Sequence, residues 1–154
     1  MQPLLGTHIP SQIAIICNDI EATKQKYAEF FGMEVPPTLD GGPYEITKCE
    51  YMGEPAKMIS CKMAFFQLGV TQFEIIEPYG GHSTWQDFLD ETGGGIHHIA
   101  YQVPDIDAAC KACESFGMKL TQKGLYGDAS GAYAYYDARE TLHCFIELLS
   151  SFRS

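Results

Sequence analysis

The feature that most constrains the fold is a stretch of sequence that occurs twice in the chain. The segment QIAIICNDIEATKQKYAEFFGMEV starts at Gln12, and HIAYQVPDIDAACKACESFGMKL starts at His98. Both contain an Ile-Ala pair directly after the first residue, then Asp-Ile, and finally Phe-Gly-Met, which aligns after a single-residue gap. A repeat of this kind indicates two copies of one supersecondary unit, each too small to build a stable core alone.

Each copy predicts the order β-α-β-β-β. Asp19 and Asp105 follow a short β-branched run and are suited to cap the N-terminus of a helix. The two helices end at Gly32 and Gly117, the residue type that favours a left-handed C-terminal cap. The predicted strands cover residues 13–17, 57–68 and 71–77 in the first copy and 99–103, 119–122, 132–136 and 142–149 in the second.

The arrangement of the copies predicts a single α+β domain over residues 1–154. The first unit covers residues 8–78, a linker covers 79–95, and the second unit covers 96–150. A short helix is expected in the linker, from Trp85 to Glu91. The first unit also carries a polar, glycine-containing insert, roughly residues 38–55, which we interpret as a mobile lid or a surface loop.

Charge and composition exclude several functions. Ten Lys and Arg residues against twenty Asp and Glu give a net charge of −10 and a pI of about 4.8, so nucleic acid and anionic membrane surfaces are not expected partners. No apolar stretch approaches the roughly 20 residues of a membrane span. The first residues lack the basic start and apolar core of an export signal, so we expect a cytoplasmic protein.

Six cysteines are present, and reduced thiols are the favoured interpretation for a cytoplasmic chain of this length. They are Cys17, Cys49, Cys61, Cys110, Cys113 and Cys144. Cys110 and Cys113 form an isolated C-x-x-C on the apolar face of the second predicted helix. No second ligand pair accompanies them, so we expect small core residues and no zinc site.

Four polar side chains occupy two equivalent positions of the repeat. Gln12 and His98 each precede the Ile-Ala pair, while Glu74 and Glu147 each interrupt an apolar last strand. The ordinary interpretation is a glutamate on the solvent face and a structural histidine. Burying an unpaired carboxylate is costly, however, and one divalent metal would satisfy all four groups. Their oxygen-rich chemistry suits Mn, Co, Ni, Fe or Zn.

Paired β-α-β-β-β units with these four positions resemble the vicinal oxygen chelate superfamily over almost the whole chain. This glyoxalase/bleomycin resistance/dioxygenase group uses two such units to curl a mixed sheet around a central cavity with one divalent metal. In its pattern the first strand of each unit gives His or Gln, and the last strand gives Glu. The resemblance therefore implies Gln12, Glu74, His98 and Glu147 as the metal ligands, supplied by one chain or by two chains of a homodimer.

Within the superfamily, three features resemble the methylmalonyl-CoA epimerases: Gly-Ile-His-His-Ile at 95–99, the acidic helix start at Asp105, and Phe-Ile-Glu-Leu-Leu at 145–149. Two departures from the epimerase pattern are visible. Epimerases usually have His where this chain has Gln12, and Gln there is similar to lactoylglutathione lyases (glyoxalase I). Epimerases also carry a second glutamate base near the position of Met58, where the nearest carboxylate is Glu54.

The resemblance implies a metal-dependent enzyme that abstracts a proton next to a carbonyl, with Glu147 as base and Glu74 able to act on the opposite face. The substrate is then an acyl-CoA or, for a lactoylglutathione lyase, a thiol adduct of an α-ketoaldehyde. A third interpretation is a protein of the same fold that sequesters a small molecule. A dioxygenase is less favoured, because that site uses two His and one carboxylate around iron.

Neighbouring residues give three further expectations. His97 should point to the opposite sheet face from His98. His143 is expected on the strand face of Glu147, in contact with the site or in a plain core or surface role. Among the tyrosines at 133, 135 and 136, one alternating face is expected to line the cavity, and the glycine-rich stretch 124–131 could close over a ligand.

Overall fold

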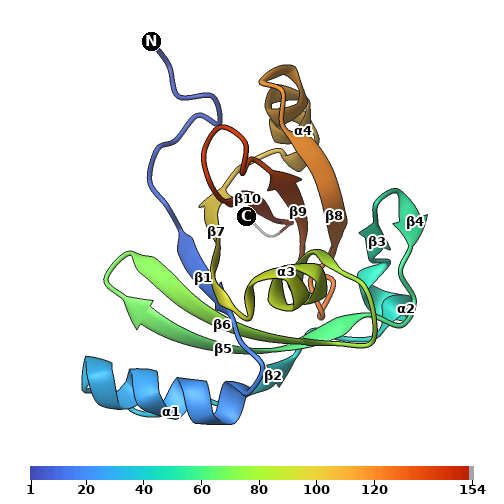
Figure 1. Cartoon of the computed structure of the whole chain (residues 1–154). Helices are drawn as coiled ribbons and strands as arrows, with labels where there is room; N and C mark the ends of the chain where they lie inside the picture. The colour runs from blue at the N-terminus through green and yellow to red at the C-terminus, as the bar shows by residue number, and fades with distance from the viewer. Residues whose placement is uncertain (153–154) are drawn as a thin grey trace.

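The computed structural model describes residues 1–152 and contains a mixed sheet of ten strands in the order β2-β5-β6-β1-β7-β10-β9-β8-β3-β4 (Figure 1). The strands are β1 (Gln12–Ile16), β2 (Leu39–Asp40), β3 (Glu50–Tyr51), β4 (Glu54–Pro55), β5 (Ser60–Leu68), β6 (Thr71–Tyr79), β7 (Gly95–Gln102), β8 (Lys119–Leu125), β9 (Gly131–Asp137) and β10 (Phe145–Ser151). In the same described part, the helices are α1 (Ile20–Phe31), α2 (Tyr44–Thr47), α3 (Thr84–Thr92) and α4 (Ile106–Ser115).

The two repeats meet at the centre of the sheet. Strands β1 and β7 pair antiparallel, and each is flanked by a parallel partner, β6 beside β1 and β10 beside β7. The outer strands continue antiparallel, and the sheet is strongly curled (Figure 1). The curl encloses a cavity of about 590 Å³. The predicted α+β class with a curved mixed sheet around a central cavity is confirmed.

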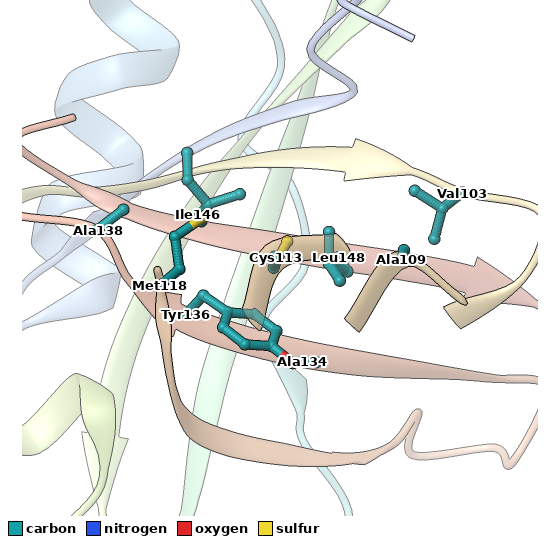
Figure 2. Close-up of a cluster of buried hydrophobic side chains, with 9 residues drawn as sticks. All are labelled: Val103, Ala109, Cys113, Met118, Ala134, Tyr136, Ala138, Ile146 and Leu148. Atoms are coloured by element: carbon teal, nitrogen blue, oxygen red, sulfur yellow. The ribbon is translucent and has the colours of Figure 1, made fainter. Parts of the chain in front are cut away.

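Helices α1 and α4 cover the convex face of the sheet. Their N-caps are those predicted: Asp19 accepts a hydrogen bond from the Ala22 amide at 3.0 Å, and Asp105 accepts one from the Ala108 amide at 3.1 Å. Helix α4 buries Cys113 in a core cluster of the second repeat, so the prediction of a core C-x-x-C is confirmed (Figure 2). No helix in the described residues is long and apolar enough to cross a membrane.

Helix α3, in the predicted linker, packs on the concave side of the sheet (Figure 1). Ser83 caps it by accepting a hydrogen bond from the Gln86 amide at 2.9 Å. Trp85 is buried, and its indole Nε1 donates to the Tyr135 hydroxyl at 3.1 Å. The helix therefore contributes the Trp85 side chain to the wall of the cavity.

The insert at residues 38–55 joins the two edges of the curled sheet. Strand β2 pairs with β5 at one edge, and β3 pairs with β8 at the other. Between them, the backbone at Gly42 approaches Gly127 so closely that a Cβ added at Gly42 would lie 3.0 Å from the Gly127 Cα. The Tyr51 hydroxyl also donates to Asp87 of α3. The insert thus forms part of the cavity wall, which the expectation of a lid or surface loop did not anticipate.

Candidate metal centre

Four neighbouring strands each carry one of the four side chains that the sequence singles out. In the order β6, β1, β7 and β10, these are Glu74, Gln12, His98 and Glu147. Residues that pair directly across neighbouring strands point to the same face of a sheet. Ala14 pairs with both Glu74 and His98, and Ala100 pairs with both Gln12 and Glu147. Because His98 and Ala100 are two residues apart in β7, all four polar side chains lie on one face. None is more than 5% exposed. One chain therefore brings all four together.

The donor atoms of this cluster converge on one point. His98 Nε2 lies 2.9 Å from Glu147 Oε2, 3.5 Å from Glu74 Oε1 and 3.1 Å from Gln12 Oε1. The same Gln12 atom lies 3.1 Å from Glu74 Oε1 and 3.0 Å from Glu147 Oε2. Metal bonds of about 2.1 Å place neighbouring donors about 3.0 Å apart in octahedral and about 3.4 Å apart in tetrahedral geometry. The spacing fits a single divalent ion.

The orientation of the Gln12 amide also suits a cation. Its Nε2 donates to Gln72 Oε1 at 2.8 Å, which turns Oε1 toward the oxygens of Glu74 and Glu147. A metal bound by Gln12 needs this orientation, with Oε1 toward the two carboxylates. In the inverted orientation the amide would instead donate a hydrogen bond to Glu74 Oε1 and to Glu147 Oε2 without an ion.

Burial and charge set the pKa values in the cluster. Burial lowers the pKa of His98, but the adjacent Glu147 and Glu74 outweigh it and raise that pKa to about 9. Burial raises the pKa of Glu74, and the hydrogen bond from His98 offsets this only in part. Without an ion, His98 therefore retains its proton at neutral pH, and a divalent ion would replace that positive charge.

The prediction for His97 was wrong. Ala14 of β1 pairs with His98, and the next residue, Ile15, pairs with Ile96. His97 therefore has no partner in β1 and forms a bulge in β7. A bulge interrupts side-chain alternation. His97 consequently lies beside His98 with the two Nδ1 atoms 2.8 Å apart, and both rings are fully buried.

The cavity beside the cluster has a largely aromatic and apolar wall. Tyr133 and Tyr135 line it, while Tyr136 is buried in the cluster under α4, which confirms the predicted alternation. The thiols of Cys49 and Cys61 also line the cavity, and burial raises the pKa of both. In the sequence, no spacing distinguishes these two residues from core cysteines, so their place in the cavity wall could not be predicted.

Three other positions lie away from the cavity. Met58, where epimerases carry a second glutamate base, is 78% exposed, and Glu54 is exposed in β4. His143 does not share the strand face of Glu147, because residues 138–143 form a turn with His143 at a φ of 66° and β10 begins only at Phe145. Its exposure agrees with the surface role that was the alternative expectation. In the described residues, the carboxylates that line the cavity are those of Asp40, Glu74, Asp128 and Glu147.

Comparison with known proteins gives the family. The sequence profile of the Glyoxalase/Bleomycin resistance protein/Dioxygenase superfamily matches residues 11–136. The chain belongs to this superfamily. The resemblance inferred from the repeat and its four polar positions is thereby confirmed.

Members of the superfamily that resemble this chain include epimerases. An ethylmalonyl-CoA/methylmalonyl-CoA epimerase of Cereibacter sphaeroides is 30% identical over 115 residues, which cover 74% of this chain and 75% of the relative. The methylmalonyl-CoA epimerase structure from Mycobacterium tuberculosis superposes with a TM-score of 0.66 at 20% identity, covering 99% of this chain and 93% of that one. The structure of a Streptomyces coelicolor methylmalonyl-CoA epimerase variant with bound 2-nitronate-propionyl-CoA superposes with a TM-score of 0.64 at 22% identity. The match covers 94% of this chain and 97% of that one. The two structures show a shared fold.

Proposed function

We propose that this chain is a divalent-metal-dependent epimerase that removes and returns the proton next to the carbonyl of a coenzyme A thioester. The observation that carries the proposal is the buried cluster of Gln12, Glu74, His98 and Glu147 at the wall of a cavity of about 590 Å³. The 30% identity to an ethylmalonyl-CoA/methylmalonyl-CoA epimerase supports the reaction type and the thioester.

The four clustered side chains would hold the metal, which is Co, Mn, Ni, Zn or Fe on the basis of one imidazole and three oxygen donors. When bound, such an ion supplies Lewis-acid stabilisation of the negative charge that develops on a carbonyl oxygen. The rings of Trp85, Tyr133 and Tyr135 contact one another and give the cavity an aromatic wall.

The two glutamates supply the proton chemistry. Glu147 takes the proton from the carbon next to the carbonyl, and Glu74 delivers a proton to the opposite face of the same carbon. Reversal of the two roles gives the reaction in the other direction. The substrate gains and loses one proton, so no redox partner is needed. The support for these roles is that both carboxylates are buried, line the cavity and lie on opposite sides of the central strand pair.

A lactoylglutathione lyase-like reaction is the second candidate, and Gln12 favours it, because epimerases usually have His at this position. In that reaction the same base would move a proton between two neighbouring carbons of a thiol adduct of an α-ketoaldehyde. A sequestering protein would have no need for four converging donors. We also propose a cytoplasmic homodimer, although the four donors of one chain already form the cluster.

Proton exchange tests the proposed function. The protein is loaded with Co²⁺ and incubated in D₂O with methylmalonyl-CoA, and separately with the adduct of methylglyoxal and glutathione. Metal-dependent deuterium at the carbon next to the thioester supports the epimerase. Conversion of the glutathione adduct alone supports the lyase. A metal-loaded protein that acts on neither substrate contradicts both enzymatic assignments and leaves sequestration.

A further inference from the structure

The Nδ1 atom of His98 points away from the metal cluster and contacts a residue outside it. His98 directs Nε2 at the cluster, and its Nδ1 lies 2.8 Å from Nδ1 of His97. The Nε2 atom of His97 lies 3.2 Å from Oγ1 of Thr84, the first residue of α3. All three side chains are buried. A continuous path of hydrogen bonds therefore leads from the cluster to the start of a helix.

The direction of each hydrogen bond follows from the chemistry of the imidazole. A histidine that binds a metal through Nε2 carries its hydrogen on Nδ1. That hydrogen faces Nδ1 of His97. The His97 Nδ1 atom must therefore accept a hydrogen bond from His98 and carries no hydrogen of its own. The remaining hydrogen of a neutral His97 ring lies on Nε2 and is donated to Thr84 Oγ1. One proton arrangement satisfies both contacts.

We propose that His97 is a positioning residue of the metal centre: a neutral imidazole whose Nδ1 accepts from His98 and holds that ligand in its metal-binding tautomer. Metal-binding histidines usually donate their other N–H to a carboxylate, a carbonyl or water. Here a second histidine takes this role, and the bulge in β7 is the device that brings it there. The inference rests on the proposed metal site and not on the identity of the substrate.

The surroundings hold the His97 ring in this orientation. It stacks on Phe145 with ring centroids 4.4 Å apart and an interplanar angle of 19°, and Phe88 meets it edge-on. The amide of Thr84 donates to Gln122 Oε1 at 3.0 Å, which fixes the residue that receives the hydrogen bond from His97. These contacts leave the ring little freedom to turn Nδ1 away from His98.

Metal affinity of matched variants tests this role. His97→Phe retains the stacked ring and removes the acceptor, and we expect the Kd for Co²⁺ to rise about 10- to 100-fold. His97→Asn places an amide oxygen near the former Nδ1, and we expect its Kd to stay within about threefold of wild type. His8→Phe, which removes an exposed histidine, is the control and should bind as wild type. Thermal unfolding without metal monitors the fold of each variant.

The hydrogen positions in the wild-type protein give an independent test. Histidine ¹⁵N chemical shifts should show His97 protonated at Nε2 and unprotonated at Nδ1, and His98 protonated at Nδ1. A hydrogen on Nδ1 of His97, wild-type Co²⁺ affinity in His97→Phe, or an equal loss in His97→Asn and His97→Phe would overturn the proposal. Neither the Co²⁺ affinity nor the ¹⁵N shifts depend on turnover. A protein that shows the expected affinities and shifts but no activity would therefore contradict the proposed reaction and leave the role of His97 supported.

Discussion

Glu74 and Glu147 reach the same cluster from the two strands that flank the central β1–β7 pair, one from β6 and the other from β10. The oxygen of each that faces the cluster lies within 3.5 Å of the same His98 nitrogen. Because they belong to equivalent strands of the two repeats, they approach the cavity from opposite sides. The proposed function assigns these two carboxylates the removal and the return of the proton.

Glu147→Gln retains the size of the side chain and an oxygen donor but removes the base. We expect turnover to fall by about 10²- to 10⁴-fold, the contribution of a positioned base, while bound metal is retained. Measuring both turnover and metal content separates the two effects. Glu140→Gln, an exposed carboxylate shortly before β10, is the control and should retain full activity. Activity of Glu147→Gln within about tenfold of wild type would sink the assigned role.

Gln12 should contribute to metal binding through its oxygen. Gln12→Leu removes that donor, and we expect the Kd for Co²⁺ to rise at least about tenfold, by analogy with the losses seen when metal-site residues are changed. Gln12→His supplies a nitrogen donor in its place and should retain binding. Gln67→Leu, at an exposed position of β5, controls for the loss of an amide. Equal Co²⁺ affinity of Gln12→Leu and wild type in a spectroscopic titration would exclude Gln12 as a ligand.

Metal affinity should depend on pH through His98. Its pKa of about 9 in the ion-free cluster means that the ring is protonated at pH 7, whereas a metal requires its Nε2 unprotonated. Binding therefore displaces a proton, and the apparent affinity should rise about tenfold per pH unit until the pH reaches about 9, then level off. Mn²⁺ titrations followed by electron paramagnetic resonance between pH 6 and 8 measure this slope. A flat profile would show that no proton is displaced.

Gly80 is constrained by the backbone beside it. Its φ is 90°, and an added Cβ would lie 1.9 Å from the carbonyl oxygen of Met58. Gly53 is the matched control, because its φ is 83° and nothing lies within 4 Å of an added Cβ. We expect Gly80→Ala to lower the free energy of unfolding by about 1–3 kcal/mol more than Gly53→Ala, since only the former adds a clash to the strained φ. Urea denaturation measures both, and equal losses would contradict the packing around Gly80.

The repeat explains why the convergence of these four side chains could be predicted from the sequence. Equivalent strands of two copies bring equivalent residues to the same face, so Gln12 with His98 and Glu74 with Glu147 follow from the alignment of the copies. The helix caps at Asp19 and Asp105 depend only on local sequence and were predicted for the same reason.

The errors arose where pairing with a distant segment decides the structure. Strict alternation of side chains fails at His97 because β7 has one residue more than β1 at this point and forms a bulge. The sequence of neither strand taken alone indicates this bulge. His143 lies in a turn because its amide bonds back to the Ala138 carbonyl, whereas the sequence suggested a longer strand. Pairing of the insert with β8 joins residues far apart in the chain, and no local signal predicts it.

The proposed function depends on Gln12, Glu74, His98 and Glu147 holding one divalent ion. Elemental analysis of the purified, tag-free protein beside a His98→Ala/Glu147→Ala double variant tests it most directly. We predict about one equivalent of Mn, Co, Ni, Zn or Fe in the wild type, or its uptake with a rise in Tm when such an ion is added, and loss of both effects in the variant. A wild-type protein that contains no metal and gains no thermal stability from these ions would contradict the account.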